Sequence, residues 1–161
     1  MTKDDVFNIL DVNAARGKTS AKIFFAVSLL IVAGGVLICV LKESNLAAGA
    51  VVGGIGLLFS VITGVMLLTN SMAKQVERVK NILGSNPEHL VWSYVFQQNN
   101  RGMITISVIM NFKDGKTYSI DQNVIPGKDT AGFMNALAQF NPGMHIGYSE
   151  EIEYKFKKRT L

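Results

Sequence analysis

Two long apolar stretches dominate the pattern of hydrophobic and polar positions, and they predict two membrane-spanning helices. Residues 23–41 and 46–72 contain no Asp, Glu, Lys, Arg or His. At about 1.5 Å per residue, a helix over residues 23–41 would be about 28 Å long, close to the ~30 Å hydrocarbon thickness of a bilayer. Because hydrocarbon offers the backbone no hydrogen-bond partner, both stretches are expected to be helical.

The polar connector Lys42-Glu43-Ser44-Asn45 separates the two stretches. It is so short that the helices are expected to form an antiparallel hairpin, with both termini on one side of the membrane. The positive-inside rule makes that side the cytoplasm, because basic residues flank the hairpin at its outer ends: Lys3, Arg16, Lys18, Lys22, Lys74, Arg78 and Lys80. The expected location is a bacterial inner or plasma membrane. A cleaved signal peptide is the competing interpretation. It is disfavoured because the apolar region of a signal peptide is typically about 7–15 residues long, which is shorter than the stretch over residues 23–41.

Small residues recur along the second apolar stretch and predict close helix packing. Gly49 and Gly53 form one small-xxx-small row, and Gly56, Ser60 and Gly64 form a second. One interpretation is that these residues only pack the two helices of one chain together. The other is that they also assemble a homo-oligomer. We expect self-association, because a single hairpin needs one such face and this stretch offers two rows.

The segments that flank the hairpin carry helical periodicity. Residues 2–15 predict a short amphipathic helix that ends at a break around Gly17. This helix is expected either to lie on the membrane surface or to dock on a soluble domain. After the second stretch, the spacing of Val76, Val79 and Leu83 predicts that the helix continues as a stalk.

From Leu90 onward the apolar period changes to two, which is typical of strands. Two alternating runs lie within residues 90–112, and Asp114-Gly115 predicts a tight turn into a returning strand. A helix is predicted over residues 130–140 and a last strand over residues 152–156. Together these elements predict a four- or five-stranded, mainly antiparallel sheet with one or two helices on one face.

These elements divide the chain into four parts. They are an N-terminal amphipathic cytoplasmic helix and linker (1–20), a two-helix transmembrane hairpin (21–71), a helical stalk (72–85) and a cytoplasmic α+β domain (86–161). The predicted fold class is therefore a membrane α-helical hairpin joined to a small α+β domain.

Composition and charge change this picture little. Charged residues make up 17% of the chain, against about 25% in soluble proteins, because the apolar stretches carry none. The net charge is +4. A basic C-terminal cluster either contacts anionic lipid headgroups or is a solvated tail; it consists of Lys155, Lys157, Lys158 and Arg159. Nucleic-acid binding is not expected, because this cluster lacks free aromatic stacking partners.

Motifs that would indicate catalysis are missing from the sequence. The two histidines, His89 and His145, have no neighbours at metal-ligand spacing. Cys39 is the only cysteine and lies within the first apolar stretch. The sequence contains neither a Gly-x-Ser-x-Gly nucleophile motif nor a Walker-type phosphate loop. We therefore expect no catalytic residue, no metal and no cofactor.

The sequence favours a non-enzymatic integral membrane protein whose cytoplasmic domain binds a protein or senses a small ligand. Its expected partners are the lipid bilayer, further copies of the chain, and a cytoplasmic protein or small ligand. One alternative is a channel or membrane-permeabilising effector gated by the domain. It is disfavoured because the apolar stretches contain no ionisable residue to line a water path. A second alternative is a membrane-bound enzyme of unknown type.

Overall fold

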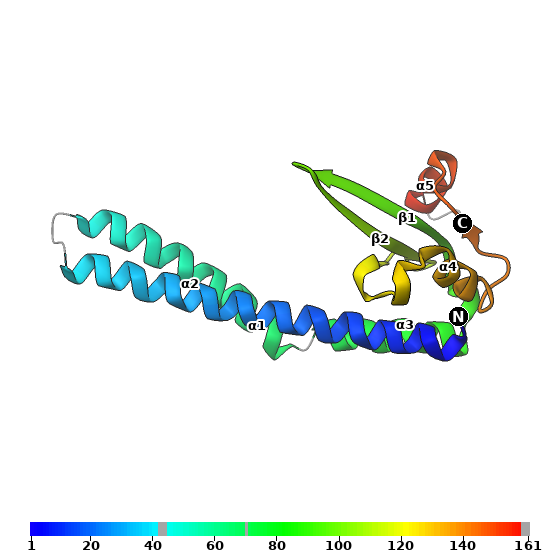
Figure 1. The fold of residues 1–161 in the computed structure, drawn as a ribbon, viewed down its shortest axis with the longest axis horizontal. Helices are drawn as coiled ribbons and strands as arrows, with labels where there is room; N and C mark the ends of the chain where they lie inside the picture. The colour runs from blue at the N-terminus through cyan, green and yellow to red at the C-terminus, as the bar shows by residue number, and fades with distance from the viewer. Residues whose placement is uncertain (42–44, 70, 159–161) are drawn as a thin grey trace. The chain divides into compact units, whose positions relative to one another are not determined.

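The structure is a computed structural model, and it describes residues 1–41, 45–69 and 71–158 (Figure 1). It divides into two compact units. The helical unit is Ala15–Met72, and the α+β unit combines Met1–Ala14 with Ala73–Leu161. The first residues of the chain therefore belong to the same folded unit as its C-terminal half.

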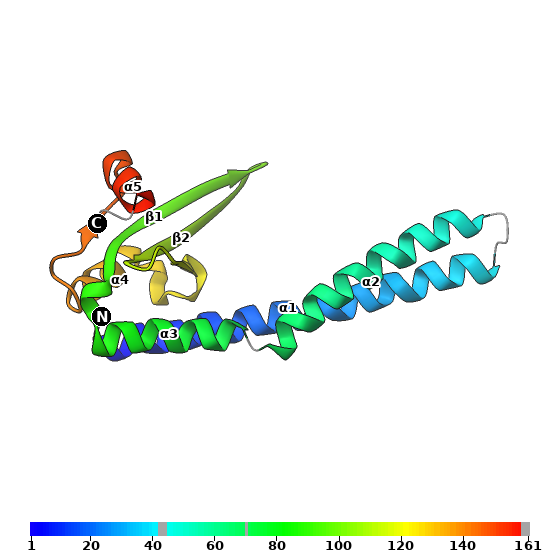
Figure 2. The same cartoon turned by 180° about the vertical axis from the view of Figure 1, so that it is seen from behind.

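Two long helices contribute to the helical unit. Helix α1 spans Lys3–Leu41 and helix α2 spans Leu46–Leu68. Figure 2 shows α2 running alongside the C-terminal part of α1. The helices predicted over both apolar stretches are thus confirmed, and both are long and apolar enough to cross a membrane. The connector residues Lys42, Glu43 and Ser44 lie outside the described residues.

The predicted break around Gly17 is wrong, because α1 continues through it. A glycine inside a helix costs only about 1 kcal/mol relative to alanine. The absent side chain leaves room for Met72, whose sulfur lies close to the position that a Cβ on Gly17 would occupy. This glycine is therefore a packing position within the helix and not its end.

Helix α3 spans Ser71–Ser85 and follows soon after α2; Asn70, between them, lies outside the described residues. The spacing of Val76, Val79 and Leu83 marks one face of this helix, as the sequence predicts. That face is buried in the core of the α+β unit. α3 is therefore packed into a folded unit along the side that the periodicity identifies.

Within the described residues, the sheet has four strands in the order β3-β2-β1-β4. Strand β1 (Leu90–Asn100) pairs antiparallel with β2 (Met103–Phe112), and β2 pairs antiparallel with β3 (Thr117–Asp121). The short strand β4 (His145–Ile146) joins β1 in parallel. The sheet is thus mixed and mainly antiparallel. The predicted tight turn before β3 is present, with Gly115 at φ +80°.

Helix α4 (Thr130–Ala138) confirms the predicted helix. Asp129 caps it by accepting a hydrogen bond from the Gly132 amide at 2.8 Å, which satisfies an amide that has no partner inside the helix. Short 3₁₀ turns complete the connections: η2 (Pro87–His89), η3 (Gln122–Val124) and η4 (Pro126–Lys128).

The strand predicted over residues 152–156 is wrong, because this segment is helix α5 (Glu150–Lys157). Ser149 caps the helix by accepting a hydrogen bond from the Ile152 amide. Acidic residues occupy the first turn and basic residues the last, which suits the helix dipole. Two ion pairs at i,i+4 spacing add support; they are Glu151–Lys155 and Glu153–Lys157. These local polar contacts outweigh the alternation of apolar side chains.

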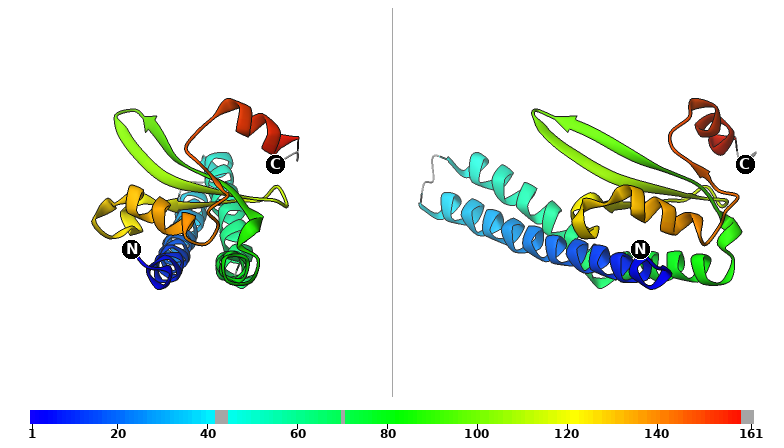
Figure 3. Two further views of the ribbon diagram at one scale, coloured as in Figure 1. Left: turned by 90° about the vertical axis from the view of Figure 1, so that its right-hand side faces the viewer. Right: turned by 45° about the vertical axis from the view of Figure 1, so that its right-hand side comes forward.

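Helices cover both faces of the sheet and not one face as predicted (Figure 3). Ser93 on β1 lies 3.2 Å from the Met134 sulfur on α4. The preceding residue, Trp92, packs on Phe156 of α5 with ring centroids 6.1 Å apart. Because successive strand residues point to opposite faces, α4 and α5 lie on opposite sides of β1.

The core of the α+β unit includes the first turns of α1. Val6, Ile9 and Leu10 are buried in one cluster with residues of α3, α4 and the sheet. Asn13 also donates a hydrogen bond to the Tyr118 hydroxyl at 3.1 Å. Of the two placements left open for residues 2–15, docking on the soluble domain is the one that the structure shows.

Candidate functional site

An aromatic cluster lies on the face of β1 that α5 covers. Trp92 stacks on Tyr94 with ring centroids 4.5 Å apart, and Tyr148 meets Tyr94 edge-on at 5.5 Å. Trp92 is buried, whereas the rings beyond it on the same face are only partly covered. The cluster therefore packs α5 at one end and presents open aromatic surface at the other.

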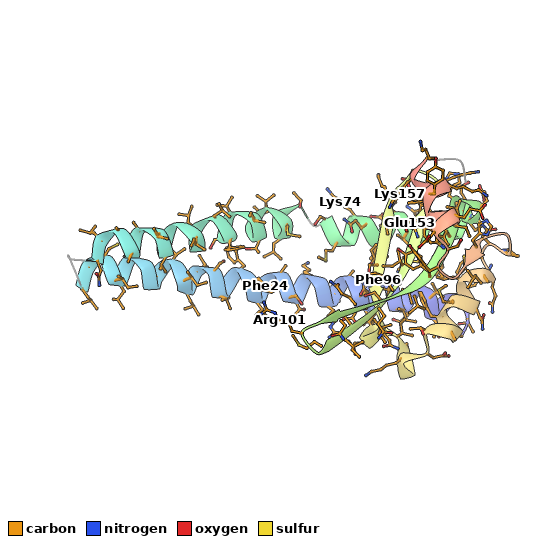
Figure 4. The ribbon with its side chains drawn as sticks, turned by 90° about the horizontal axis from the view of Figure 1, so that it is seen from above. Phe24, Lys74, Phe96, Arg101, Glu153 and Lys157 are labelled. Carbon is orange, nitrogen blue, oxygen red and sulfur yellow. The ribbon has the colours of Figure 1, made fainter. Side chains whose placement is uncertain are left out.

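The open end of this cluster forms a groove of about 360 Å³, here called the aromatic groove. It is lined by Tyr94, Val95, Phe96, Tyr148 and Glu153. Figure 4 labels Phe96 on β1 and Glu153 on α5, the two elements that border it. A single carboxylate thus stands beside several aromatic rings.

The local sequence around Gly147 places Tyr148 at the groove. Gly147 has φ +93°, a conformation that favours glycine. Its amide donates to the Ser93 carbonyl at 2.9 Å, and its own carbonyl accepts a hydrogen bond from the Trp92 indole at 2.7 Å. These two bonds fasten the segment before α5 to β1, so that Tyr148 is held against Tyr94.

The groove holds one ionised carboxylate among neutral phenols. Hydrogen bonds donated by Lys157 and by the Tyr148 hydroxyl, the latter at 2.7 Å, lower the pKa of Glu153. The same hydrogen bond to Glu153 raises the pKa of Tyr148. Burial, and then the charge of Glu153, raises the pKa of Tyr94. At neutral pH the groove therefore carries the ionised Glu153 carboxylate, paired with the Lys157 ammonium at 2.6 Å, and polar but uncharged hydroxyl groups.

A second groove, of about 420 Å³, is basic in character; its lining residues are Lys74, Gln75, Arg78, Lys116, Thr117 and Tyr118. Arg78 pairs with Asp114 at 2.6 Å, and Lys116 lies 3.8 Å from the same carboxylate. Burial opposes ionisation of Asp114, but the Lys116 amide and the two cations together lower its pKa. Two of the three basic side chains are thus already engaged within the chain.

The small residues predicted for helix packing lie against α1 within the helical unit. A Cβ on Gly49 would be 2.8 Å from the Gly35 carbonyl oxygen, and one on Gly56 would be 2.8 Å from the Val32 amide nitrogen. Ser60 donates a hydrogen bond to the Ser28 hydroxyl at 2.9 Å.

Gly53 and Gly64 also face α1, near Gly35 and Phe25 respectively. All five small residues therefore serve the contact between the two helices of one chain. Their use between copies of the chain stays a prediction.

The basic C-terminal cluster is engaged with neighbouring side chains. Lys155 pairs with Glu151, and Lys157 pairs with Glu153, each at 2.6 Å. Lys158 lies over the Tyr154 ring, 5.6 Å from its centroid. The fourth predicted residue, Arg159, lies outside the described residues. Contact with lipid headgroups stays a prediction for this cluster.

Neither histidine lines either groove. His89 stands 4.0 Å from Glu88 at the end of η2, and His145 belongs to β4. In the part of the chain that the structure describes, no three His, Cys, Asp or Glu side chains are placed to hold a metal ion.

The aromatic groove is not among the sites that the sequence predicts, although the strand that forms one side of it can be recognised in the sequence. Trp92, Tyr94 and Phe96 alternate along one run, which indicates an aromatic strand face. Comparison of the chain with protein-family models, with curated proteins and with solved structures gave no significant match.

Proposed function

We propose that this protein is a membrane-anchored, non-enzymatic binding protein. Its two apolar helices cross a bilayer as a hairpin, and its α+β unit binds a ligand or partner at the membrane surface. The observation that carries the proposal is the outward surface of α1 and α2, which is formed by large apolar side chains. The binding role is supported by the aromatic groove, whose rings are only partly used in packing α5.

The outward surface of the helix pair is unsuited to water. Large apolar side chains are exposed along both helices, reaching 87% for Leu68. A soluble protein buries such side chains, and contiguous apolar patches above a few hundred Å² mark interfaces or membrane contact. The small residues lie between the helices and the large ones lie outside, which is the arrangement expected of a membrane hairpin.

Chain connectivity supports a topology with both termini on one side of the membrane. The helical unit is a single insertion, residues 15–72, between two segments of the α+β unit. The α+β unit buries Val6 before the hairpin and Val79 after it in one core, so both segments must lie on the same side. The flanking basic residues assign that side to the cytoplasm.

We still propose self-association, but not through the small residues that the sequence suggests. The five small residues contact α1 in the same chain. A second copy would therefore meet the outward faces of the helices, for example near Gly54, where a Cβ would have no atom within 4 Å.

Single cysteines are expected to report this topology. In a Cys39→Ser background, Asp4→Cys and Lys113→Cys in the α+β unit should be shielded from a membrane-impermeant maleimide in intact spheroplasts. Asn45→Cys, at the start of α2, should be labelled. After permeabilisation all three variants should be labelled equally.

Other labelling patterns would contradict the proposed topology. Labelling of Asp4→Cys and Lys113→Cys from opposite sides would show that the hairpin does not return across the membrane. Loss of Asp4→Cys from the mature chain would show that the first helix is cleaved as a signal peptide. Release of the wild-type protein by alkaline carbonate would show that it is not inserted.

A further inference from the structure

We propose that the aromatic groove binds a quaternary ammonium group, with aromatic rings around the alkylated nitrogen and Glu153 beside it. This inference rests on the proposed function only in taking the groove as the binding surface of the α+β unit. It does not depend on membrane insertion, which has its own test.

The rings of the groove provide the attraction that such a cation requires. The faces of aromatic rings carry negative electrostatic potential and attract cations within about 6 Å of the ring centroid. Tyr94, Phe96 and Tyr148 line one groove, and two of them are in edge-on contact. Quaternary ammonium ions are weakly hydrated, so removing their water costs less free energy than removing the water of a metal ion. More of the attraction to the rings therefore remains as binding free energy.

Exposure shows that these rings are not fully used in packing. Phe96 is 46% exposed and Tyr148 is 58% exposed, although Trp92 beneath them is buried. Packing of α5 therefore accounts for Trp92 and leaves the outer rings available to a ligand.

The charge of the groove selects a cation over an anion. The pKa of Glu153 is lowered by the hydrogen bonds from Lys157 and Tyr148, so its carboxylate is ionised at neutral pH. The raised pKa values of Tyr94 and Tyr148 keep both phenols neutral. An anionic ligand would meet the carboxylate, whereas a cation that takes the place of Lys157 is attracted by the carboxylate and by the faces of neighbouring rings.

Lys157 is the internal competitor for this carboxylate. Its ammonium nitrogen lies 2.6 Å from Glu153, and most of its side chain is exposed to solvent. Because the Lys157 side chain is largely exposed, this pair contributes little and breaks readily. A ligand cation can therefore displace Lys157, and removal of the Lys157 charge should strengthen ligand binding.

Choline is the probe for this site, and the fluorescence of Trp92 reports its binding. Trp92 is the only tryptophan of the chain, and it stacks on Tyr94 at the edge of the groove. The full chain is studied in maltoside micelles, which contain no ammonium group, with sodium chloride to match ionic strength. We expect saturable quenching or enhancement of Trp92 fluorescence by choline chloride, and no saturable response to its neutral isostere, 3,3-dimethylbutan-1-ol.

Variants locate the binding in the groove. Tyr148→Leu and Glu153→Gln are each expected to weaken choline binding about two- to fivefold, as loss of one exposed cation–π or charge contact implies. Lys157→Met should strengthen it. The matched control is Tyr154→Leu, which should leave binding unchanged. Tyr154 lies on α5, is exposed to a similar degree as Tyr148 (63% against 58%) and does not line the groove.

Two arms in reconstituted vesicles separate the sources of the cation. A Trp92 response to free choline in phosphatidylglycerol vesicles assigns the site to a soluble ammonium compound. A Trp92 emission shift in phosphatidylcholine vesicles that Glu153→Gln reduces assigns it to a lipid headgroup. An equal response to choline and its neutral isostere, or a response that Tyr148→Leu and Glu153→Gln leave unchanged, would overturn the proposal. The cysteine labelling pattern would be unaffected by that failure.

Discussion

Leu10→Asp is expected to unfold the α+β unit, although Leu10 lies far in sequence from the sheet. Leu10 is 0% exposed and packs in the same cluster as Val79 and Phe133. An aspartate there would place an unpaired carboxylate in an apolar core, which costs more than about 4 kcal/mol in comparable cases. That cost is a large share of the about 5–15 kcal/mol by which a domain is stable.

The matched control for this prediction is Val12→Asp on the same helix. Val12 is 45% exposed, so the same new charge reaches solvent and the unit should stay folded. Thermal unfolding followed by Trp92 fluorescence in mild detergent compares the two variants with the wild type. A chain without residues 1–14 should behave like Leu10→Asp. An unchanged melting temperature for Leu10→Asp would show that the first turns of α1 are dispensable for the core.

Gly35→Leu is expected to separate α1 from α2, whereas Gly34→Leu is expected to be tolerated. A Cβ on Gly35 would lie 2.6 Å from the Gly53 Cα and 2.8 Å from the Gly49 carbonyl oxygen. These are backbone atoms of α2 and cannot move without moving the helix. A Cβ on Gly34 would have no atom within 4 Å. Overpacking of this kind typically costs about 1–3 kcal/mol of stability. The Cβ alone already clashes, and the leucine side chain adds further atoms beyond it.

Unfolding by added sodium dodecyl sulfate, starting from mild detergent and followed by far-ultraviolet circular dichroism, measures the stability of the hairpin. Gly35→Leu should shift the midpoint to lower sulfate fractions, and Gly34→Leu should not. Chemical crosslinking of the same variants tests the role of the small residues between copies. If Gly35→Leu abolished oligomers while leaving the unfolding midpoint unchanged, the glycines would serve assembly and not the hairpin.

Periodicity predicted the elements whose burial repeats along the chain. The apolar stretches gave α2 and the second half of α1, and the spacing of Val76, Val79 and Leu83 identified the buried face of α3. Alternation and the Asp114-Gly115 turn identified the strands of the β1–β2–β3 meander. In each case one face of the helix or strand packs against a neighbouring element over several residues. The apolar pattern is therefore long enough to be recognised in that segment alone.

The features that the sequence pattern missed have different physical causes. In α5, apolar residues at alternate positions indicate a strand, but the Ser149 cap and the two i,i+4 ion pairs make a helix. At Gly17 the helix continues because its neighbours in α1 outweigh one unfavourable residue. Strand β4 has two residues, which is too short for any periodicity to show.

One wall of the aromatic groove was predictable and the other was not. Tyr94 and Phe96 follow Trp92 on one strand face, which the alternation shows. Tyr148 and Glu153 reach the groove only because α5 is a helix and because Gly147 is bonded to β1. The first condition depends on local polar contacts within α5 and its cap. The second depends on a hydrogen bond between Trp92 and Gly147, which are 55 residues apart in sequence.

The burial of the first turns of α1 has a consequence for biosynthesis. Asn13 and its hydrogen-bond partner Tyr118 are 105 residues apart in the chain. At about 5–20 residues per second, the ribosome needs roughly 5–20 s to make that interval. The helical unit, residues 15–72, is made within this interval, while Val6, Ile9 and Leu10 are still without their core. If the helical unit inserts into a membrane as proposed, insertion precedes closure of the α+β unit, whose core is complete only after the sheet has been synthesised.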